Sequence, residues 1–185
     1  MILIADSGST KTDWVLTDGR NQSWFQTKGI NPFFQSADEI VGMLQQEVDS
    51  SHRVQIDAIH FYGAGCIKGQ TDSLVHDALV RFWGNCQVEI NDDMLGAARA
   101  LFGAEAGIAC ILGTGANSAY YDGQHITDKV PTLGFILGDE GSGAYLGKNF
   151  LNCYFKREFP SQLEADIAKD LKLFWPDVLQ SVYKQ

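Results

Sequence analysis

The stretch ILIADSGSTKTDWVLTDG, residues 2–19, decides the fold of this chain. Two apolar runs, 2–5 and 14–16, flank a turn of small polar residues, which predicts a β-hairpin with 23–27 as a third strand. A hairpin tip of this composition exposes backbone N–H groups and hydroxyls that can bind phosphate oxygens. Asp6 stands at the entrance of the turn, where a carboxylate can hold Mg²⁺ or its waters. The alternative interpretation is an ordinary polar hairpin turn.

Helical and strand patterns alternate after this opening. Ser36 with Glu39 predicts a capped helix, because the apolar residues that follow recur at helical spacing. In chain order we expect a strand at 54–62, a helix at 71–82, a strand at 87–90 and a helix at about 92–102. This alternation predicts an α/β sheet with crossover connections. A strand at 108–112 and another at 118–122 begin the same plan again, which indicates two related halves, and the chain is mostly helical beyond Gly147.

The composition excludes several classes of protein. The 185 residues are 45% hydrophobic and 20% charged, as in a folded globular protein. Fourteen Lys and Arg against 23 Asp and Glu give a net charge of -9, the wrong sign for a nucleic-acid partner. The four cysteines show no metal-ligand spacing, and no run approaches the length of a membrane span. Without a signal-peptide pattern, we expect a cytoplasmic protein with reduced thiols.

Two further stretches place polar side chains at a glycine turn or at the start of a helix. Gly113-Thr-Gly-Ala-Asn117 repeats the small-residue turn between two strands, and two such turns facing each other can grip a triphosphate from both sides. Neither turn is a Walker A loop or a dinucleotide-binding glycine motif. Asn91-Asp92-Asp93 stands between a strand and a helix, where an Asp can cap the helix or act as the general base for an alcohol.

Two other positions offer contacts to a polar ligand. Asp139, in Gly138-Asp-Glu-Gly-Ser-Gly143, can cap a helix or hydrogen-bond sugar hydroxyls. Asn31, in Gly29-Ile-Asn-Pro32, can form a turn or use its amide as a donor and acceptor for a sugar. The residues alone leave both interpretations open.

Five of these motifs, in this order and approximate spacing, resemble those of the N-acetylglucosamine kinases. They are Asp6-Ser-Gly-Ser-Thr-Lys-Thr-Asp13, Gly29-Ile-Asn31, Asn91-Asp92, Leu112-Gly-Thr-Gly-Ala-Asn117 and Gly138-Asp-Glu-Gly-Ser142. These kinases belong to a wider group with the activating ATPases of benzoyl-CoA reductase and 2-hydroxyacyl-CoA dehydratase. The resemblance implies an α/β, ribonuclease H-like (actin-like ATPase) fold with a mixed sheet flanked by helices and two related domains, the second of them incomplete in this chain.

The resemblance also implies an activity and a set of site residues. The activity is ATP-dependent phosphorylation of N-acetylglucosamine, or a related amino sugar, at the 6-hydroxyl, with Mg²⁺ as cofactor and a homodimer as the family's habit. The implied phosphate ligands are Gly8, Ser9, Thr10, Lys11, Thr114 and Gly115, with Asp6 near Mg²⁺. Asp92 is implied as the base, and Asn31, Asn117 and Asp139 as the sugar ligands. Ala116 departs from the family, which commonly has Ser at that position.

The length of the chain departs further from the family. Members carry a complete second domain with a late glycine turn against the adenosine, and no candidate for that turn follows Gly147. We therefore expect an N-terminal domain at 1–105 and the first part of a second domain at 106–185. The sequence does not distinguish a fragment of a longer protein from a product that is inactive alone.

Two other functions remain open at this stage. One is an activating ATPase with an iron–sulfur cluster at a dimer interface, for which Cys66 or Cys110 would be the ligand. The other is a non-catalytic sugar or nucleotide sensor, or a remnant of a kinase. Turnover distinguishes the kinase from a binding module.

Overall fold

We analysed a computed structural model of the chain, which describes residues 1–183. The chain divides into two compact units. The first comprises Met1–Ile111 and Ser118–Val130, and the second comprises Leu112–Asn117 and, of the described residues, 131–183. The domain boundary that the sequence suggests between residues 105 and 106 stays a prediction. Among residues 1–183, no helix is long and apolar enough to span a lipid bilayer.

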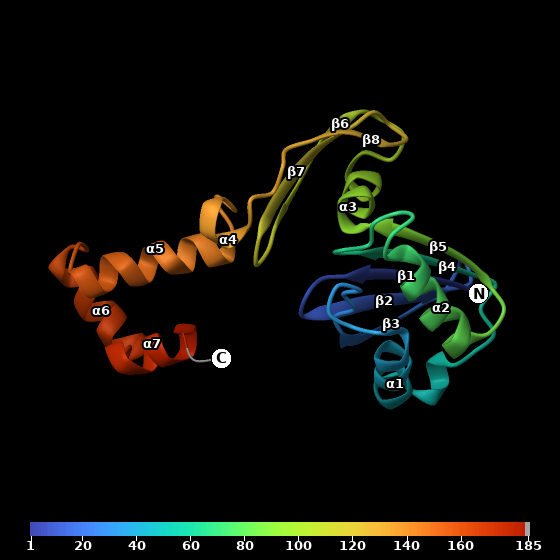
Figure 1. The fold of residues 1–185 in the computed structure, drawn as a ribbon, viewed down its shortest axis with the longest axis horizontal. Coiled ribbons are helices and arrows are strands. Elements are labelled where there is room, and N and C mark those ends of the chain that lie inside the picture. The colour runs from blue at the N-terminus through green and yellow to red at the C-terminus, as the bar shows by residue number, and fades with distance from the viewer. Residues whose placement is uncertain (184–185) are drawn as a thin grey trace. The chain divides into compact units, whose positions relative to one another are not determined.

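A five-stranded mixed sheet forms the centre of the first unit (Figure 1). Its strand order is β3-β2-β1-β4-β5, with β1, β2 and β3 antiparallel and β1, β4 and β5 parallel. The elements are β1 (Ile2–Ser7), β2 (Lys11–Thr17), β3 (Gln22–Lys28), α1 (Ala37–Glu47), the 3-10 turn η1 (Ser50–His52), β4 (Ala58–Gly63), α2 (Asp72–Trp83), β5 (Gln87–Asp92) and α3 (Asp93–Phe102). The meander followed by two crossovers agrees with the α/β architecture predicted from the sequence.

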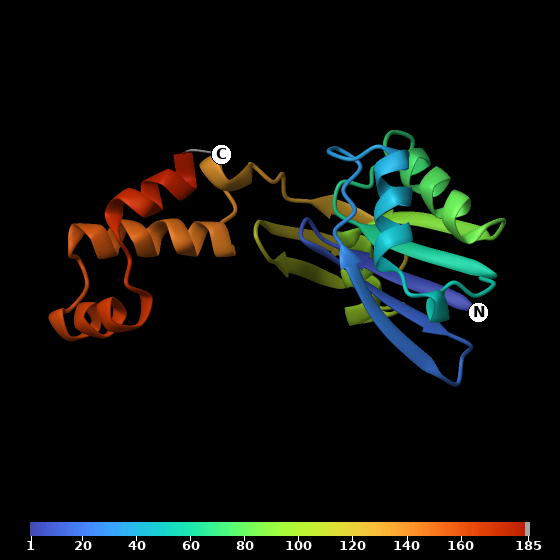
Figure 2. The ribbon, with the colours of Figure 1, turned by 90° about the horizontal axis from the view of Figure 1, so that it is seen from below.

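The core of this unit lies on one face of the sheet. Strand residues alternate between buried and accessible positions, so that Leu3 and Ala5 of β1 and Trp14 of β2 are fully buried. Helices α1 and α2 cover this face (Figure 2), contributing the buried side chains Ile40, Val41, Leu44, Val75, Ala78 and Leu79. The predicted capping box at the start of α1 is present, with the Ser36 side chain and Glu39 bonded reciprocally.

The predicted strand at 54–62 begins later than expected. Ser50–His52 form a 3-10 turn that starts at an Asp49 cap, and the strand runs only over Ala58–Gly63. Apolar Val54 and Ile56 alternate as strand residues do, but Ile56 instead buries its side chain in the core from an irregular segment. An alternating pattern alone therefore gave a boundary four residues too early.

A second, three-stranded sheet contains β6 (Gly107–Leu112), β7 (Ala116–Tyr121) and β8 (Ile126–Lys129), in that order. Strand β8 was not expected, because only four residues with few apolar side chains form it. Helix α3 packs between this sheet and β4 and β5 of the larger one (Figure 1), and a second core forms around it from Met94, Ala98, Ala109, Ala119 and Tyr121.

Helices dominate the second unit. They are α4 (Gly134–Leu137), α5 (Gly143–Lys156), α6 (Ser161–Leu171) and α7 (Trp175–Tyr183). The helix expected from Ser142 or Gly143 corresponds to α5, whereas the single turn α4 was not predicted. None of these four helices buries a residue fully within the described chain, so large apolar side chains such as Ile136 and Leu146 are exposed.

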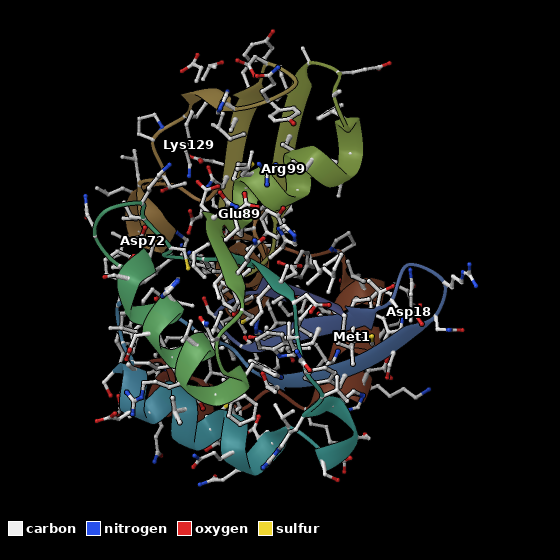
Figure 3. The ribbon with its side chains drawn as sticks, turned by 90° about the vertical axis from the view of Figure 1, so that its right-hand side faces the viewer. Met1, Asp18, Asp72, Glu89, Arg99 and Lys129 are labelled. Carbon is white, nitrogen blue, oxygen red and sulfur yellow. The ribbon has the colours of Figure 1, made fainter. Side chains whose placement is uncertain are left out.

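Glu89 connects three other side chains on the sheet face opposite α1 and α2. Its carboxylate accepts hydrogen bonds from Asn91 at 2.8 Å and Arg99 at 3.1 Å, and lies 2.9 Å from His60 Nδ1. Figure 3 shows Glu89 beside Arg99. Hydrogen bonds from Asn91, Arg99 and His60 hold the pKa of Glu89 down at about 2.

We expect Glu89→Gln to lower the free energy of unfolding at pH 7 by about 1 kcal/mol or less, because the carboxylate is 44% exposed and solvent screens it. Because the pKa of Glu89 is lower in the folded protein, its carboxylate stabilises the fold at pH values above its pKa in the unfolded chain, near 4.5. This stabilisation is lost as the pH falls towards 2. The difference between variant and wild type in urea unfolding should therefore shrink between pH 5 and pH 2. Glu105→Gln, at an exposed position, is the control. A pH-independent difference would contradict the prediction.

Candidate functional site

The turn between β1 and β2 presents its tip to solvent. Gly8 N–H donates to the Lys11 carbonyl at 3.0 Å, which closes the turn, and Gly8, Ser9 and Thr10 are exposed. Lys11 Nζ lies 2.8 Å from the Asp13 carboxylate. The four predicted phosphate ligands of this turn therefore lie together, with the Lys11 ammonium already paired to a carboxylate.

Two hydroxyls of this segment are buried below the tip. Ser7 and Thr12 are both fully buried, and their oxygens lie 2.7 Å apart. Ser7 also accepts from Ile30 N–H at 2.9 Å, and Thr12 donates to the Lys28 carbonyl at 3.1 Å. These buried hydroxyls join the hairpin to the end of β3 and to the residues that follow it. Sequence reasoning missed this role, although Ser7 stands in phase with the buried Leu3 and Ala5.

Gly29 packs against the backbone of the turn between β1 and β2. Its N–H donates to the Thr10 carbonyl at 3.0 Å, and a Cβ at this position would lie 2.3 Å from the Gly8 carbonyl oxygen. Real Cβ atoms do not approach a backbone oxygen so closely. Glycine is therefore required here because the backbone at 8–9 passes directly against it.

Asn31 forms the turn that its Asn-Pro step predicts. Its Oδ1 accepts from Phe33 N–H at 3.0 Å, and its own N–H donates to Gln35 Oε1 at 2.7 Å. Within residues 1–183 no hydrogen bond involves Asn31 Nδ2. The structure thus confirms the turn, while the sugar contact stays a prediction.

The carboxyl ends of β1, β4 and β5 meet at one edge of the sheet. Ser7, Gly63 and Asp92 are register partners across these three strands, so Asp6 and Asp92 belong to the same edge. Ligands commonly bind at this edge of α/β sheets. Asp6 also faces Asp13 across the hairpin. Burial raises the pKa of Asp6, the Asp13 charge raises it further, and Lys11 partly offsets both effects.

Asp92 and Asp93 begin helix α3. Asp92 is its N-cap, with Oδ1 accepting from Leu95 N–H at 2.8 Å, so the capping interpretation holds for one of its two oxygens. Asp92 Oδ2 lies 3.6 Å from Lys129 Nζ. Burial raises the pKa of Asp93, and its neighbour Asp92 raises it further, whereas the Met94 N–H and Lys129 lower it.

A magnesium ion suits this edge chemically. Its ligands are oxygens, and in phosphate-transferring sites it takes one or two carboxylates together with phosphate oxygens and waters. Asp6 and Asp13, opposite each other on β1 and β2, supply carboxylates beside the glycine turn. Within residues 1–183 no cluster of three or more His, Cys, Asp or Glu forms a complete metal cage. The residues present therefore fit an ion that shares its ligands with phosphates.

The remaining predicted ligands belong to the second unit. Ala144 N–H donates to the Thr114 carbonyl at 3.2 Å, and Gly143 N–H donates to the Gly113 carbonyl at 2.8 Å, which ties this turn to the start of α5. A Cβ at Gly115 would lie 3.0 Å from Asp139 Oδ2. The structure thus brings Thr114, Gly115 and Asp139 together.

Asn117 follows the same turn on β7. Its Oδ1 is buried and has no hydrogen-bond partner in the part of the chain that the structure describes. Buried amide oxygens are almost always hydrogen-bonded in proteins. An unsatisfied acceptor two residues after the turn is therefore consistent with a ligand position, which stays a prediction.

Cys66 and Cys110, the two candidate cluster ligands, lie in different environments. Cys66 is buried, and desolvation raises the pKa of its thiol to about 12. Cys110 is exposed on β6.

Comparisons with known proteins identify the architecture. No family model matches the chain, and no curated protein matches it. A solved protein from Porphyromonas gingivalis, provisionally named an N-acetylglucosamine kinase, is 46% identical, with a TM-score of 0.92. The match covers 100% of this chain and 66% of that one. A solved protein from Chromobacterium violaceum with the same provisional name is 18% identical, with a TM-score of 0.72. That match covers 100% of this chain and 68% of the other.

A third neighbour shares only the fold. The ethanolamine utilization protein EutJ from Carboxydothermus hydrogenoformans is 18% identical, with a TM-score of 0.53 over 92% of this chain and 61% of that one. This chain has the actin-like ATPase fold. The α/β, ribonuclease H-like architecture expected from the five motifs is thereby confirmed.

These comparisons do not test the other expectations that followed from the resemblance. The chain spans just under two thirds of the P. gingivalis protein, 66% of its length. Membership of the wider group that includes the activating ATPases stays a prediction. The roles of the individual site residues stay predictions as well.

Proposed function

We propose that this chain belongs to an ATP-dependent kinase that phosphorylates N-acetylglucosamine, or a related amino sugar, at the 6-hydroxyl. The observation that carries this proposal is the 46% identity, over the whole of this chain, to a protein provisionally named an N-acetylglucosamine kinase. Actin-like ATPase folds host more than one activity, so the site residues must supply the rest of the argument.

The first unit supplies the elements that phosphoryl transfer requires. Gly8, Ser9, Thr10 and Lys11 form an exposed turn whose hydroxyls and ammonium would bind phosphate oxygens. The Gly8 N–H is already used to close the turn, so backbone donors to a phosphate would come from the other residues of the turn. Asp6, with Asp13 opposite, would hold Mg²⁺. When bound, the ion supplies positive charge against the phosphates. In the second unit, the Thr114–Gly115 turn would contribute further phosphate contacts.

Asp92 is the proposed general base. The sugar 6-oxygen attacks the γ-phosphorus, the bond from that phosphorus to the ADP oxygen breaks, and the hydroxyl proton passes to the Asp92 carboxylate. Asp92 suits this role because its Oδ1 is fixed by the helix cap while Oδ2 remains accessible. Asn31, Asn117 and Asp139 are the proposed sugar ligands.

The partners and location follow as part of the same proposal. The acceptor is a small sugar, no nucleic acid is involved, and the protein acts in the cytoplasm, with a homodimer as the assembly. The net charge of -9 supports the exclusion of nucleic acid.

A coupled assay of ADP release tests the proposal. Mg-ATP is supplied with a panel of hexoses and N-acetylhexosamines to this chain and to any longer product of the same reading frame. We expect turnover that depends on N-acetylglucosamine. Hydrolysis of ATP that is independent of every sugar would contradict the kinase and favour an activating ATPase, and sugar binding without turnover in either product would favour a sensor.

A further inference from the structure

Lys129 is held at the start of helix α3 by a strand that the sequence did not reveal. It ends β8, where it is the register partner of Ala119, and Val130 N–H extends the ladder to the Ser118 carbonyl at 3.2 Å. All of these residues belong to the first unit. The backbone of Lys129 is therefore fixed, and its ammonium lies 3.6 Å from Asp92 Oδ2. Figure 3 shows Lys129 near this end of the sheet.

The two oxygens of Asp92 have different neighbours. Oδ1 accepts the cap hydrogen bond from Leu95 at 2.8 Å, and Oδ2 faces the ammonium. A separation of 3.6 Å is longer than a hydrogen bond, so Oδ2 is attracted by the charge yet keeps room to accept a proton. The cap and the ammonium together determine where Oδ2 points.

The surroundings of Asp92 are otherwise acidic. Asp93 is adjacent on α3, and Asp6 belongs to the same edge on β1. Cys66 lies in the loop after β4, and the charges of Asp92 and Asp93 add to burial in raising the pKa of its thiol. The other nearby ammonium, that of Lys11, is paired with Asp13. A phosphate group entering this edge meets several negative charges, and Lys129 opposes them.

We infer that Lys129 is a positioning residue for Asp92, holding Oδ2 aligned towards the acceptor hydroxyl and offsetting the repulsion between that carboxylate and the incoming phosphate. The inference rests on the proposed function. Because Lys129 acts through Asp92, its loss should slow the chemical step without weakening the binding of either substrate.

The first test compares Lys129→Met and Lys129→Arg in the product that phosphorylates sugar. Lys129→Met should lower kcat by about tenfold to a hundredfold, the scale of a misaligned catalytic group, with KM for ATP and sugar nearly unchanged. Lys129→Arg should restore most of the rate, since it keeps the charge.

Lys169→Met is the matched control, because it makes the same change on the exposed surface of α6. It should leave kcat and the KM values for ATP and sugar as in the wild type. Thermal unfolding of each variant shows whether the β7–β8 hairpin remains folded. An unchanged kcat for folded Lys129→Met, or no recovery with Lys129→Arg, would overturn the inference while leaving the kinase intact.

A second measurement does not require turnover. Carboxyl ¹³C NMR of this chain follows the titration of Asp93, whose pKa Lys129 lowers. Lys129→Met should raise the pKa of Asp93, and an unchanged titration would overturn the placement of the ammonium. If the wild-type protein phosphorylates no sugar, the proposed function fails, and the catalytic role of Lys129 fails with it even if the Asp93 titration shifts.

Discussion

Replacing Asp92 by Asn is expected to lower kcat for sugar phosphorylation by about 10²- to 10⁴-fold, the range that general-base catalysis contributes. Asn is isosteric with Asp and caps helices equally well, so the hydrogen bond from Leu95 N–H to the side chain should persist. The change removes the charge and the basic oxygen while leaving α3 in place. Coupled ADP release, run where N-acetylglucosamine-dependent turnover is found, measures the effect.

The stability of this variant separates a catalytic role from a structural one. The contact with Lys129 is partly exposed, so its loss should change the free energy of unfolding by about 1 kcal/mol or less. Sugar binding, measured by calorimetry, should remain. Asp93→Asn is the matched control at the next position. An equal loss of kcat from Asp93→Asn alone would contradict the assignment of Asp92 as the base.

Gly29→Ala is expected to destabilise the protein by about 1–3 kcal/mol and to raise KM for ATP by tenfold or more. The added Cβ would lie 2.3 Å from the Gly8 carbonyl oxygen and within 3 Å of the Ser9 backbone. These atoms belong to the proposed phosphate turn and cannot swing aside as a flexible side chain can. The turn must therefore shift, which displaces its N–H groups from the nucleotide. Urea unfolding and steady-state kinetics measure the two effects.

Gly42→Ala makes the same substitution at a position where we expect the opposite effect on stability. Gly42 lies inside helix α1, and a Cβ there would meet no atom within 4 Å. Alanine favours a helix over glycine, so this variant should be more stable by about 0.5–1 kcal/mol with unchanged KM. A Gly29→Ala protein with wild-type stability and wild-type KM for ATP would show that the turn tolerates displacement.

Local patterns predicted much of the first unit. The hairpin at 2–17, the capped helix from Ser36 and the helices at 71–82 and 92–102 depend on alternation, helical spacing and capping chemistry, which neighbouring residues determine. The ordered motifs then implied the actin-like ATPase fold that the comparisons confirm. Sequence patterns did not predict the parts of the chain where residues show no clear strand alternation or helical spacing. Strand β8 has only four residues, and Ile56 is buried from a segment with no regular structure.

The sequence by itself determined the α/β class, the order of the main strands and helices of the first unit and the positions of the small-residue turns, because these depend on residues close together in the chain. Only the tertiary structure decided which polar groups face inward and which meet. It buries Ser7 and Thr12 instead of exposing them, sets Gly29 against the turn at 8–9, and brings Lys129 to Asp92 from 37 positions along the chain. Such contacts depend on how distant strands and helices pack, and no local spacing encodes them.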